Sequence, residues 1–232
     1  DKLPIIIRRM REQIIASGGE VHFACRMEEL ILERGEVRGV VCSGGRTFHG
    51  PVLLATGHSA RDVYRYLHRA EILIEAKPIA VGVRLEHPQS LIDEIRYHSP
   101  EGRGKYLPAA EYVYKAQAEG RGVYSFCMCP GGFVVPASTG PEETVVNGMS
   151  PANRGSRWAN SGLVVELHPE DIPATGIKVE DPTSPLALMQ WCEAFEHKSY
   201  LAANRSLRAP AQRMTDFVAR RHSSMLPSSS YT

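Results

Sequence analysis

The 232-residue chain carries 27 basic and 26 acidic residues, and 43% of its residues are hydrophobic. These values are typical of a globular protein and argue against a disordered segment or a general polyanion binder. No apolar run approaches the roughly 20 residues of a membrane-spanning helix, so we expect a cytoplasmic protein without a membrane segment. The five cysteines are an odd number, which argues against a secreted disulfide framework.

The first part of the chain has a helical pattern followed by short strands. Apolar residues at helical spacing predict a helix over residues 3–16, which Gly18-Gly19 would end. The pattern then changes to one that favours β structure. It predicts strands at residues 21–25, 30–32, 37–42, 47–48 and 52–55, and a helix at 60–68.

A second domain is expected to begin near residue 76, because Pro78 interrupts a strand-like stretch over 71–87. We therefore divide the chain into residues 1–75 and 76–232. A helix should follow Pro88, with Leu91, Ile92 and Ile95 on its buried side. Further strands are expected at 122–128, 133–136, 144–146 and 161–167, and further helices from Ser184-Pro185 through Phe195 and near 210–221. The predicted fold class is α+β, with a sheet-rich second domain flanked by helices.

The segment Ala55-Thr56-Gly57 follows an apolar stretch and precedes a predicted helix. Glycine lets the main chain approach a ligand, and a helix that begins behind it directs unpaired N–H groups toward an anion. Ser59 and Asp62 have the spacing of a capping box for that helix. The same pattern also suits an ordinary turn between a strand and a helix.

Four phrases of the sequence, ATGHSARD (55–62), AVGVRLEHPQSLID (80–93), FCMCPGG (126–132) and NGMS (147–150), together resemble the bacterial FAD-utilizing dehydrogenases. These are flavoproteins similar to glutathione reductase, and most have no assigned substrate. The resemblance implies an FAD-dependent oxidoreductase. It makes residues 1–75 the second part of an FAD-binding domain and 76–232 an inserted domain on the substrate side.

The chain departs from this family in having no G-x-G-x-x-G segment, which would hold the FAD pyrophosphate. We therefore expect a central fragment without the N-terminal and C-terminal FAD segments. Alone it should be inactive and hold no FAD, and its partners should include the flanking segments of its parent chain. The substrate and the electron partner are not identified by the sequence.

Cys127 and Cys129 flank one residue in a predicted strand, so both sulfurs could face the same side. A structural zinc site would need further ligands at compatible spacing, and because the sequence offers no second pair we expect no metal site. Two interpretations remain open. The cysteines could be a redox pair that reacts with flavin, or small buried residues before the Pro130-Gly131-Gly132 turn.

A polar loop over residues 147–161 supplies Asn, Ser and Arg side chains that can hold a carbonyl or a carboxylate, although Asn-Gly and Ser-Pro are also ordinary turn sequences. The resemblance implies that this loop lies beside the flavin and that Met27 lies near adenine. The candidate catalytic residues are Arg154, Asn160, Cys127 and Cys129. The candidate cofactor-binding residues are Met27, Thr56, Gly57, His58, Asn147 and Ser150.

Two other classes of protein stay open. The chain could be a non-catalytic module whose arginine-rich loops bind an anionic partner such as RNA, although its near-neutral charge argues against this. It could also be a structural domain that forms a tight dimer. No nucleophile-elbow, zincin or P-loop motif occurs, so the common hydrolase, zincin and P-loop classes find no support.

Overall fold

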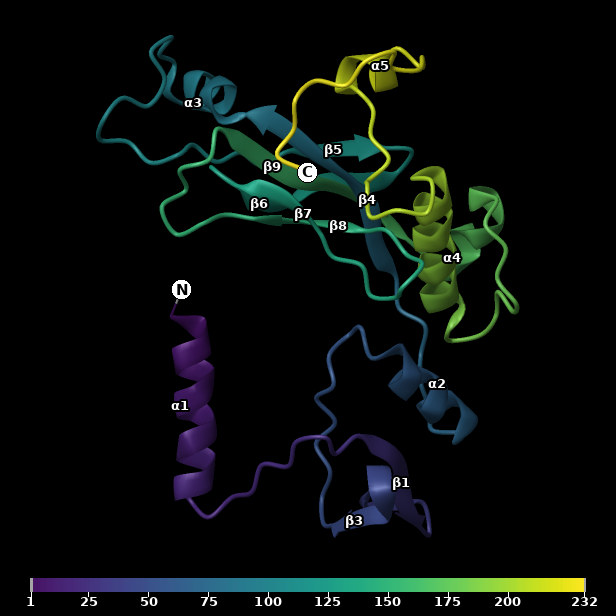
Figure 1. Ribbon diagram of the computed structural model, residues 1–232. Coiled ribbons are helices and arrows are strands. Elements are labelled where there is room, and N and C mark those ends of the chain that lie inside the picture. Colours follow the sequence, from purple (N-terminus) through teal and green to yellow (C-terminus); the bar gives the residue numbers. More distant parts are fainter. Residues whose placement is uncertain (1, 232) are drawn as a thin grey trace. The chain divides into compact units, whose positions relative to one another are not determined.

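The computed structural model describes residues 2–231 and divides into two compact units, Asp1–Ile72 and Leu73–Thr232. Helices and antiparallel strands occur in both units, so the predicted α+β class is confirmed (Figure 1). Among residues 2–231, no helix combines the length and the apolar character needed to cross a bilayer. The assignment of the units to an FAD domain and a substrate-side domain stays a prediction.

The first unit contains a small antiparallel sheet in the order β1-β2-β3, together with two α-helices and the short 3-10 helix η1. A tight turn at Arg34-Gly35 joins the first two strands, and both of its residues have positive φ (51° and 80°). The predicted helix at 3–16 is confirmed, and the one at 60–68 is shifted by one residue. The elements are α1 (Leu3–Ala16), β1 (Met27–Glu33), β2 (Glu36–Cys42), η1 (Ser43–Gly45), β3 (Arg46–His49) and α2 (Arg61–Arg69).

Two predicted strands of the first unit are wrong. Residues 21–25 form no strand, since Ala24 takes a positive φ of 49° that breaks the extended backbone. Residues 52–55 are also outside any strand, and within the described chain the backbone groups of 52–56 form no hydrogen bond. The side chain of Leu53 is 91% exposed. A strand requires a partner for its backbone groups, and the sheet β1-β2-β3 provides none to this segment.

The predicted capping box at the start of α2 is wrong as well. The helix begins after Ala60, and no side chain caps its first turn. The hydroxyl of Ser59 instead lies 3.4 Å from Nε2 of His58. Because the chain turns one residue later than the spacing predicts, Ser59 lies outside the N-cap position.

The first unit has very little buried surface within the described residues. Gly39 and Cys42 are its buried residues, and α1 has none. Five isoleucines of α1 are 47% to 58% exposed, which is unusual for a helix with so many apolar residues. They are Ile5, Ile6, Ile7, Ile14 and Ile15.

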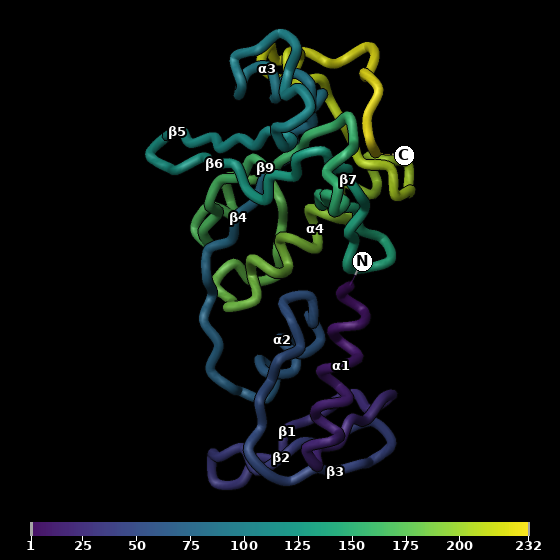
Figure 2. Tube along the Cα trace, turned by 90° about the vertical axis from the view of Figure 1, so that its left-hand side faces the viewer, coloured from purple at the N-terminus to yellow at the C-terminus, as the bar shows by residue number. Residues whose placement is uncertain are grey.

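The second unit is built on a four-stranded antiparallel sheet with the order β4-β9-β6-β5 (Figure 1). The pairing of β4 (Ile79–Pro88) with β9 (Trp158–Leu167) runs without interruption from Ile79↔Leu167 to Pro88↔Trp158. On its other side β9 pairs with β6 (Arg121–Cys129), which in turn pairs with β5 (Lys115–Ala118). Figure 2 shows the β5–β6 turn projecting from the sheet. The strand β5 was not predicted from the sequence, since all four of its residues are exposed and it has no apolar side chain larger than alanine.

A two-stranded hairpin, three α-helices and the 3-10 helix η2 complete the second unit. The predicted strand at 133–136 is confirmed, the predicted one at 144–146 begins two residues later, and the helix near 210–221 is reduced to five residues. Of the three residues expected on the buried side of the helix after Pro88, Ile92 is buried but Leu91 and Ile95 are exposed. The elements are α3 (Gln89–Tyr97), β7 (Phe133–Pro136), β8 (Val146–Met149), η2 (Pro169–Thr175), α4 (Ala187–Ala202) and α5 (Met214–Val218).

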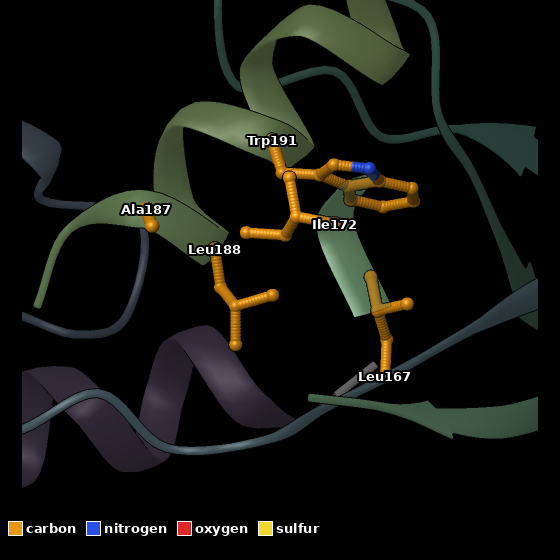
Figure 3. Packing of buried hydrophobic residues seen from close by; sticks show 5 residues of the cluster. All are labelled: Leu167, Ile172, Ala187, Leu188 and Trp191. Carbon is orange, nitrogen blue, oxygen red and sulfur yellow. The ribbon is translucent and has the colours of Figure 1, made fainter. Parts of the chain in front are cut away.

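The main core of the second unit lies between α4, η2 and the end of β9. Figure 3 shows side chains from these three elements gathered around Ile172. The indole N–H of Trp191 donates to Oγ1 of Thr175 at 2.8 Å, so the one polar atom of this large side chain is satisfied. A second cluster, formed by Ile92, Ala110 and Ala159, joins α3 to β9.

Candidate functional site

Strand register brings four polar side chains to one face of the large sheet. Asn160 of β9 lies opposite Glu86 of β4 and opposite Cys129 of β6. Directly opposed residues of an antiparallel pair share a face, and so do residues two apart in one strand. Arg84 therefore joins Glu86, Cys129 and Asn160 on this face.

A bulge in β6 shapes the edge of this face. The pairing of β6 with β9 is regular up to Phe126 and resumes at Cys129 with a shifted register. Cys127 lies within the bulge and takes a positive φ of 50°, a rare conformation outside glycine. The bulge turns the carbonyl oxygen of Cys127 toward the sheet face, where it accepts a hydrogen bond from Arg84 at 3.3 Å.

Arg84 is the centre of a group of polar residues that we call the Arg84 cluster, formed by Arg84, Cys127, Cys129, Asn147, Gly148 and Asn160. Its Nη1 donates to Oδ1 of Asn160 at 2.7 Å, and its Nη2 donates to Oδ1 of Asn147 at 3.3 Å. Within residues 2–231, no carboxylate forms an ion pair with this guanidinium. All of its acceptors are neutral oxygens.

The hairpin β7–β8 lies directly on the Arg84 cluster at Gly148. A Cβ at this position would overlap Nη1 of Arg84 and Oδ1 of Asn160, and it would lie 2.8 Å from the sulfur of Cys129. The Asn147 side chain fixes the strand here, since its Oδ1 also accepts the Gly148 N–H at 2.8 Å. Only glycine fits between the hairpin and the sheet at this point.

Asn160 is completely buried, with 0% of its surface exposed. Its Oδ1 accepts the hydrogen bond from Arg84, but its Nδ2 has no hydrogen-bond partner among the described residues. A buried donor without an acceptor costs about 1–3 kcal/mol. Such an atom marks a place where the protein alone does not complete the hydrogen-bonding pattern.

The two thiols of the Arg84 cluster have different surroundings. Cys129 is 6% exposed, whereas Cys127 is exposed to solvent. Burial raises the pKa of the Cys129 thiol, and the neighbouring Cys127 adds to this effect while Arg84 opposes it. The Cys129 sulfur donates to the carbonyl of Cys127 at 3.4 Å. A thiol with a raised pKa is a weak nucleophile at neutral pH.

The turn Pro130-Gly131-Gly132, at the end of the cysteine segment 127–132, contacts the polar loop 147–161. The hydroxyl of Ser150 donates to the carbonyl of Pro130 at 2.8 Å. A Cβ at Gly131 would overlap the carbonyl oxygen of Arg154, so the backbones of the two segments are in direct contact. Segments 127–132 and 147–161 therefore lie against each other.

The structure brings some of the predicted site residues together and separates others. Cys127, Cys129, Asn147 and Asn160 belong to the Arg84 cluster, and Ser150 lies beside it. The guanidinium of Arg154 instead forms an exposed ion pair with Glu111, at 2.6 Å from Nη1 to Oε1. Arg84 was missed. Its signal in the sequence was a charged residue in the middle of an apolar strand.

The opposite face of β4 carries a second polar pair that was also missed. His87 lies opposite Ala159, and its Nδ1 is 3.2 Å from the hydroxyl of Tyr112. Burial lowers the pKa of His87, against a smaller opposing effect of Glu86, and burial raises the pKa of Tyr112. At neutral pH both side chains are therefore uncharged.

Two of the four candidate cofactor residues of the first unit line an open cavity of about 440 Å³. Met27 and Thr56 contribute to its wall, together with Val40, Phe48 and residues 49–55. Gly57 follows with a φ of 80°, and no atom lies within 4 Å of the place that a Cβ would occupy. His58 is exposed next to it. The backbone of this wall is thus accessible, and its side chains are mainly apolar.

Comparison with known proteins agrees with the expected flavoprotein class. The family described as "FAD-dependent protein, C-terminal domain-like" matches residues 78–232, and the chain belongs to this family. An uncharacterized protein of Clostridium beijerinckii is 38% identical over 228 residues, which make up 97% of this chain and 41% of that protein. The chain therefore spans less than half the length of this relative.

Proposed function

We propose that this chain is part of an FAD-dependent oxidoreductase and that it positions the flavin and a small-molecule substrate. The observation that carries the proposal is the membership of residues 78–232 in an FAD-dependent family. When bound, the flavin supplies the electron-transfer chemistry, while the protein supplies binding, orientation and electrostatics.

The first unit offers groups that suit part of the cofactor. An apolar wall can pack against a ring system, and the backbone N–H and C=O groups of residues 52–56, which form no hydrogen bond with the described part of the chain, can bond its polar edge. By resemblance, Met27 would lie near adenine, and the main chain of Thr56 and Gly57 would approach the cofactor beside His58. The positive φ of Gly57 keeps that approach open.

The second unit offers polar groups for a carbonyl or a carboxylate. Asn147, Ser150 and Asn160 lie close together around the bulge of β6. We assign them to holding the flavin edge or the substrate. We assign Cys129 to the wall of the site, because the raised pKa keeps its thiol protonated at neutral pH.

The test begins with the longer C. beijerinckii relative and the 232-residue chain, each purified without added cofactor. Flavin released by heating is identified by chromatography. We expect about one FAD per molecule of the relative and none from the 232-residue chain, which has no G-x-G-x-x-G segment. If the relative held no flavin and bound RNA in a salt-dependent way, this would contradict the proposal and favour the non-catalytic module.

A chimera locates the cofactor contacts, with this chain replacing the matching part of the relative. Gly57→Val should reduce FAD retention about tenfold or more, because the side chain blocks the approach of the backbone. Gly35→Val is the matched control, since Gly35 has the same φ of 80° and the same open surroundings but lies in the β1–β2 turn. Equal losses in the two variants would show that backbone strain, and not a cofactor contact, is responsible.

A further inference from the structure

Arg84 is a partly buried cation that no carboxylate of residues 2–231 pairs with directly. Its guanidinium donates to the side-chain oxygens of Asn160 and Asn147 and to the Cys127 carbonyl, and all three acceptors are neutral. Removing a charge from water is unfavourable unless a counter-charge or several hydrogen bonds replace the lost hydration. The three bonds hold the guanidinium in place but leave its charge uncompensated.

The Arg84 cluster also has hydrogen-bond donors to spare. A guanidinium has five N–H groups, and the three bonds leave two of them, on Nε and Nη2, available. Nδ2 of Asn160 is a further donor, and it has no acceptor within residues 2–231. The bonds from Arg84 to Asn147 and to Cys127 are exposed to solvent, whereas the bond to Asn160 is partly buried, so the free N–H groups are approached from the side of the first two bonds.

Glu86, on the same face of β4, does not neutralise Arg84. Its carboxylate accepts hydrogen bonds from the backbone N–H of Ser230, at 3.1 Å to Oε2, and from the Ser230 hydroxyl. The same hydroxyl accepts the N–H of Val134 at 2.8 Å. These bonds to Ser230 take up the Glu86 carboxylate, and among residues 2–231 it forms no ion pair with Arg84. A negative charge remains close to the cluster and disfavours a ligand with two negative charges.

We propose that Arg84 binds the carboxylate group of a monocarboxylate substrate. One guanidinium matches one carboxylate in charge and can hold both of its oxygens, and Glu86 selects against a phosphate dianion. Asn147 and Asn160 fix the plane of the guanidinium. The identification of this ligand as a substrate rests on the proposed flavoenzyme function, but the binding site itself does not.

The test is a titration of the flavin-free 232-residue chain with sodium acetate. The Nε–H resonance of Arg84 is followed by nuclear magnetic resonance and assigned with Arg84→Lys. We expect a saturable shift with acetate, no saturable shift with chloride at equal ionic strength, and weaker binding of inorganic phosphate. A shift that chloride reproduces, or tighter binding of phosphate, would overturn the proposal.

A matched pair of variants separates loss of binding from loss of folding. Asn147→Asp keeps the acceptor for Gly148 and Arg84 but places a carboxylate beside the guanidinium, so acetate affinity should fall about tenfold or more. Asn153→Asp is the control. Oδ1 of Asn153 accepts a hydrogen bond from the N–H of Gly155 at 3.1 Å, and no arginine donates to it among the described residues. Unchanged acetate affinity in Asn147→Asp would contradict the site. Acetate binding does not depend on flavin, so absence of FAD from the relative is a separate result.

Discussion

The side-chain oxygen of Gln89 accepts the backbone N–H of Gly131 at 2.7 Å, so that the first residue of α3 holds the Pro-Gly-Gly turn. The amide nitrogen of the same side chain donates to Oδ1 of Asp93 at 2.8 Å and to the carbonyl of Ala110 at 3.1 Å. Gln89 is 3% exposed, and every polar atom of its side chain is used. This buried amide therefore joins α3, the loop before β5, and the turn beside the Arg84 cluster.

Replacing Gln89 should destabilise the second unit strongly. Gln89→Leu keeps the approximate volume but leaves the Gly131 N–H and the Ala110 carbonyl without this partner. We expect the free energy of unfolding to fall by about 2–3 kcal/mol, measured by urea denaturation. Gln117→Leu, at an exposed position of β5, is the control and should change it by less than about 0.5 kcal/mol. Similar losses in both variants would argue against the role of Gln89.

Gly131 should tolerate no side chain. Gly131→Ala combines a positive φ of 51° with an overlap between Cβ and the carbonyl oxygen of Arg154. Gly120→Ala in the β5–β6 turn has the positive φ alone, since its surroundings are open. We expect Gly120→Ala to cost about 1–2 kcal/mol and Gly131→Ala clearly more. Thermal unfolding of both variants measures the difference, and equal costs would mean that the turn can move away from Arg154.

His87 should make the chain less stable as the pH falls. Burial lowers its pKa in the folded state, against a smaller opposing effect of Glu86, so the unfolded state binds the proton more readily. The contribution of His87 to the free energy of unfolding is fully present above the pKa of the unfolded state, about 6.5. It is lost as the pH falls from there toward the pKa of the folded state. His87→Gln removes this titration and should lose less stability between about pH 7.5 and about pH 5.5.

Denaturation at several pH values tests the role of His87. His222→Gln, at an exposed histidine, is the control and should keep the pH dependence of the parent chain. If His87→Gln also kept that dependence, another group would have to carry the titration. The ring resonances of His87 provide a direct check, because their titration midpoint should lie below the ordinary histidine value.

The cysteines around the bulge should react with iodoacetamide at very different rates. Cys127 is exposed, whereas Cys129 is buried and its pKa is raised by burial. Cys42 is buried too, and burial together with the neighbouring Cys25 raises its pKa. Peptide mass spectrometry should find Cys127 modified first and Cys129 and Cys42 modified only after unfolding. Equal rates for Cys127 and Cys129 would favour the redox pair over the buried wall.

Local sequence patterns were sufficient to predict a helix with an apolar stripe and a short run of strand-forming residues. The segments at 3–16 and 133–136 have these two patterns, and the structure confirms both elements. The extended segment at 52–55 has a strand-like composition but no partner, and strand formation depends on contacts that a local pattern does not contain. The exposed strand β5 shows the reverse case, because it exists only through its pairing with β6.

Only part of the candidate site was predicted, because the site also depends on strand pairing that a local pattern does not contain. Asn160 and the two cysteines of the bulge could be chosen by residue type and by the turn that follows them. Their common neighbour Arg84 lies 76 positions before Asn160, and only the register of β4 with β9 places the two side chains together. Arg154 was chosen for its chemistry, but Glu111, 43 positions away, takes up its charge.

The first unit should exchange its amide hydrogens faster than the second. Its buried residues are Gly39 and Cys42, whereas the second unit contains the apolar cluster around Trp191 and a continuous ten-residue pairing of β4 with β9. Amide protection follows the free energy of local opening, which is small where few apolar groups are buried. Hydrogen exchange followed by mass spectrometry should show low protection in α1 and high protection in β9. Equal or greater protection in the first unit would mean that contacts outside its own small sheet stabilise it.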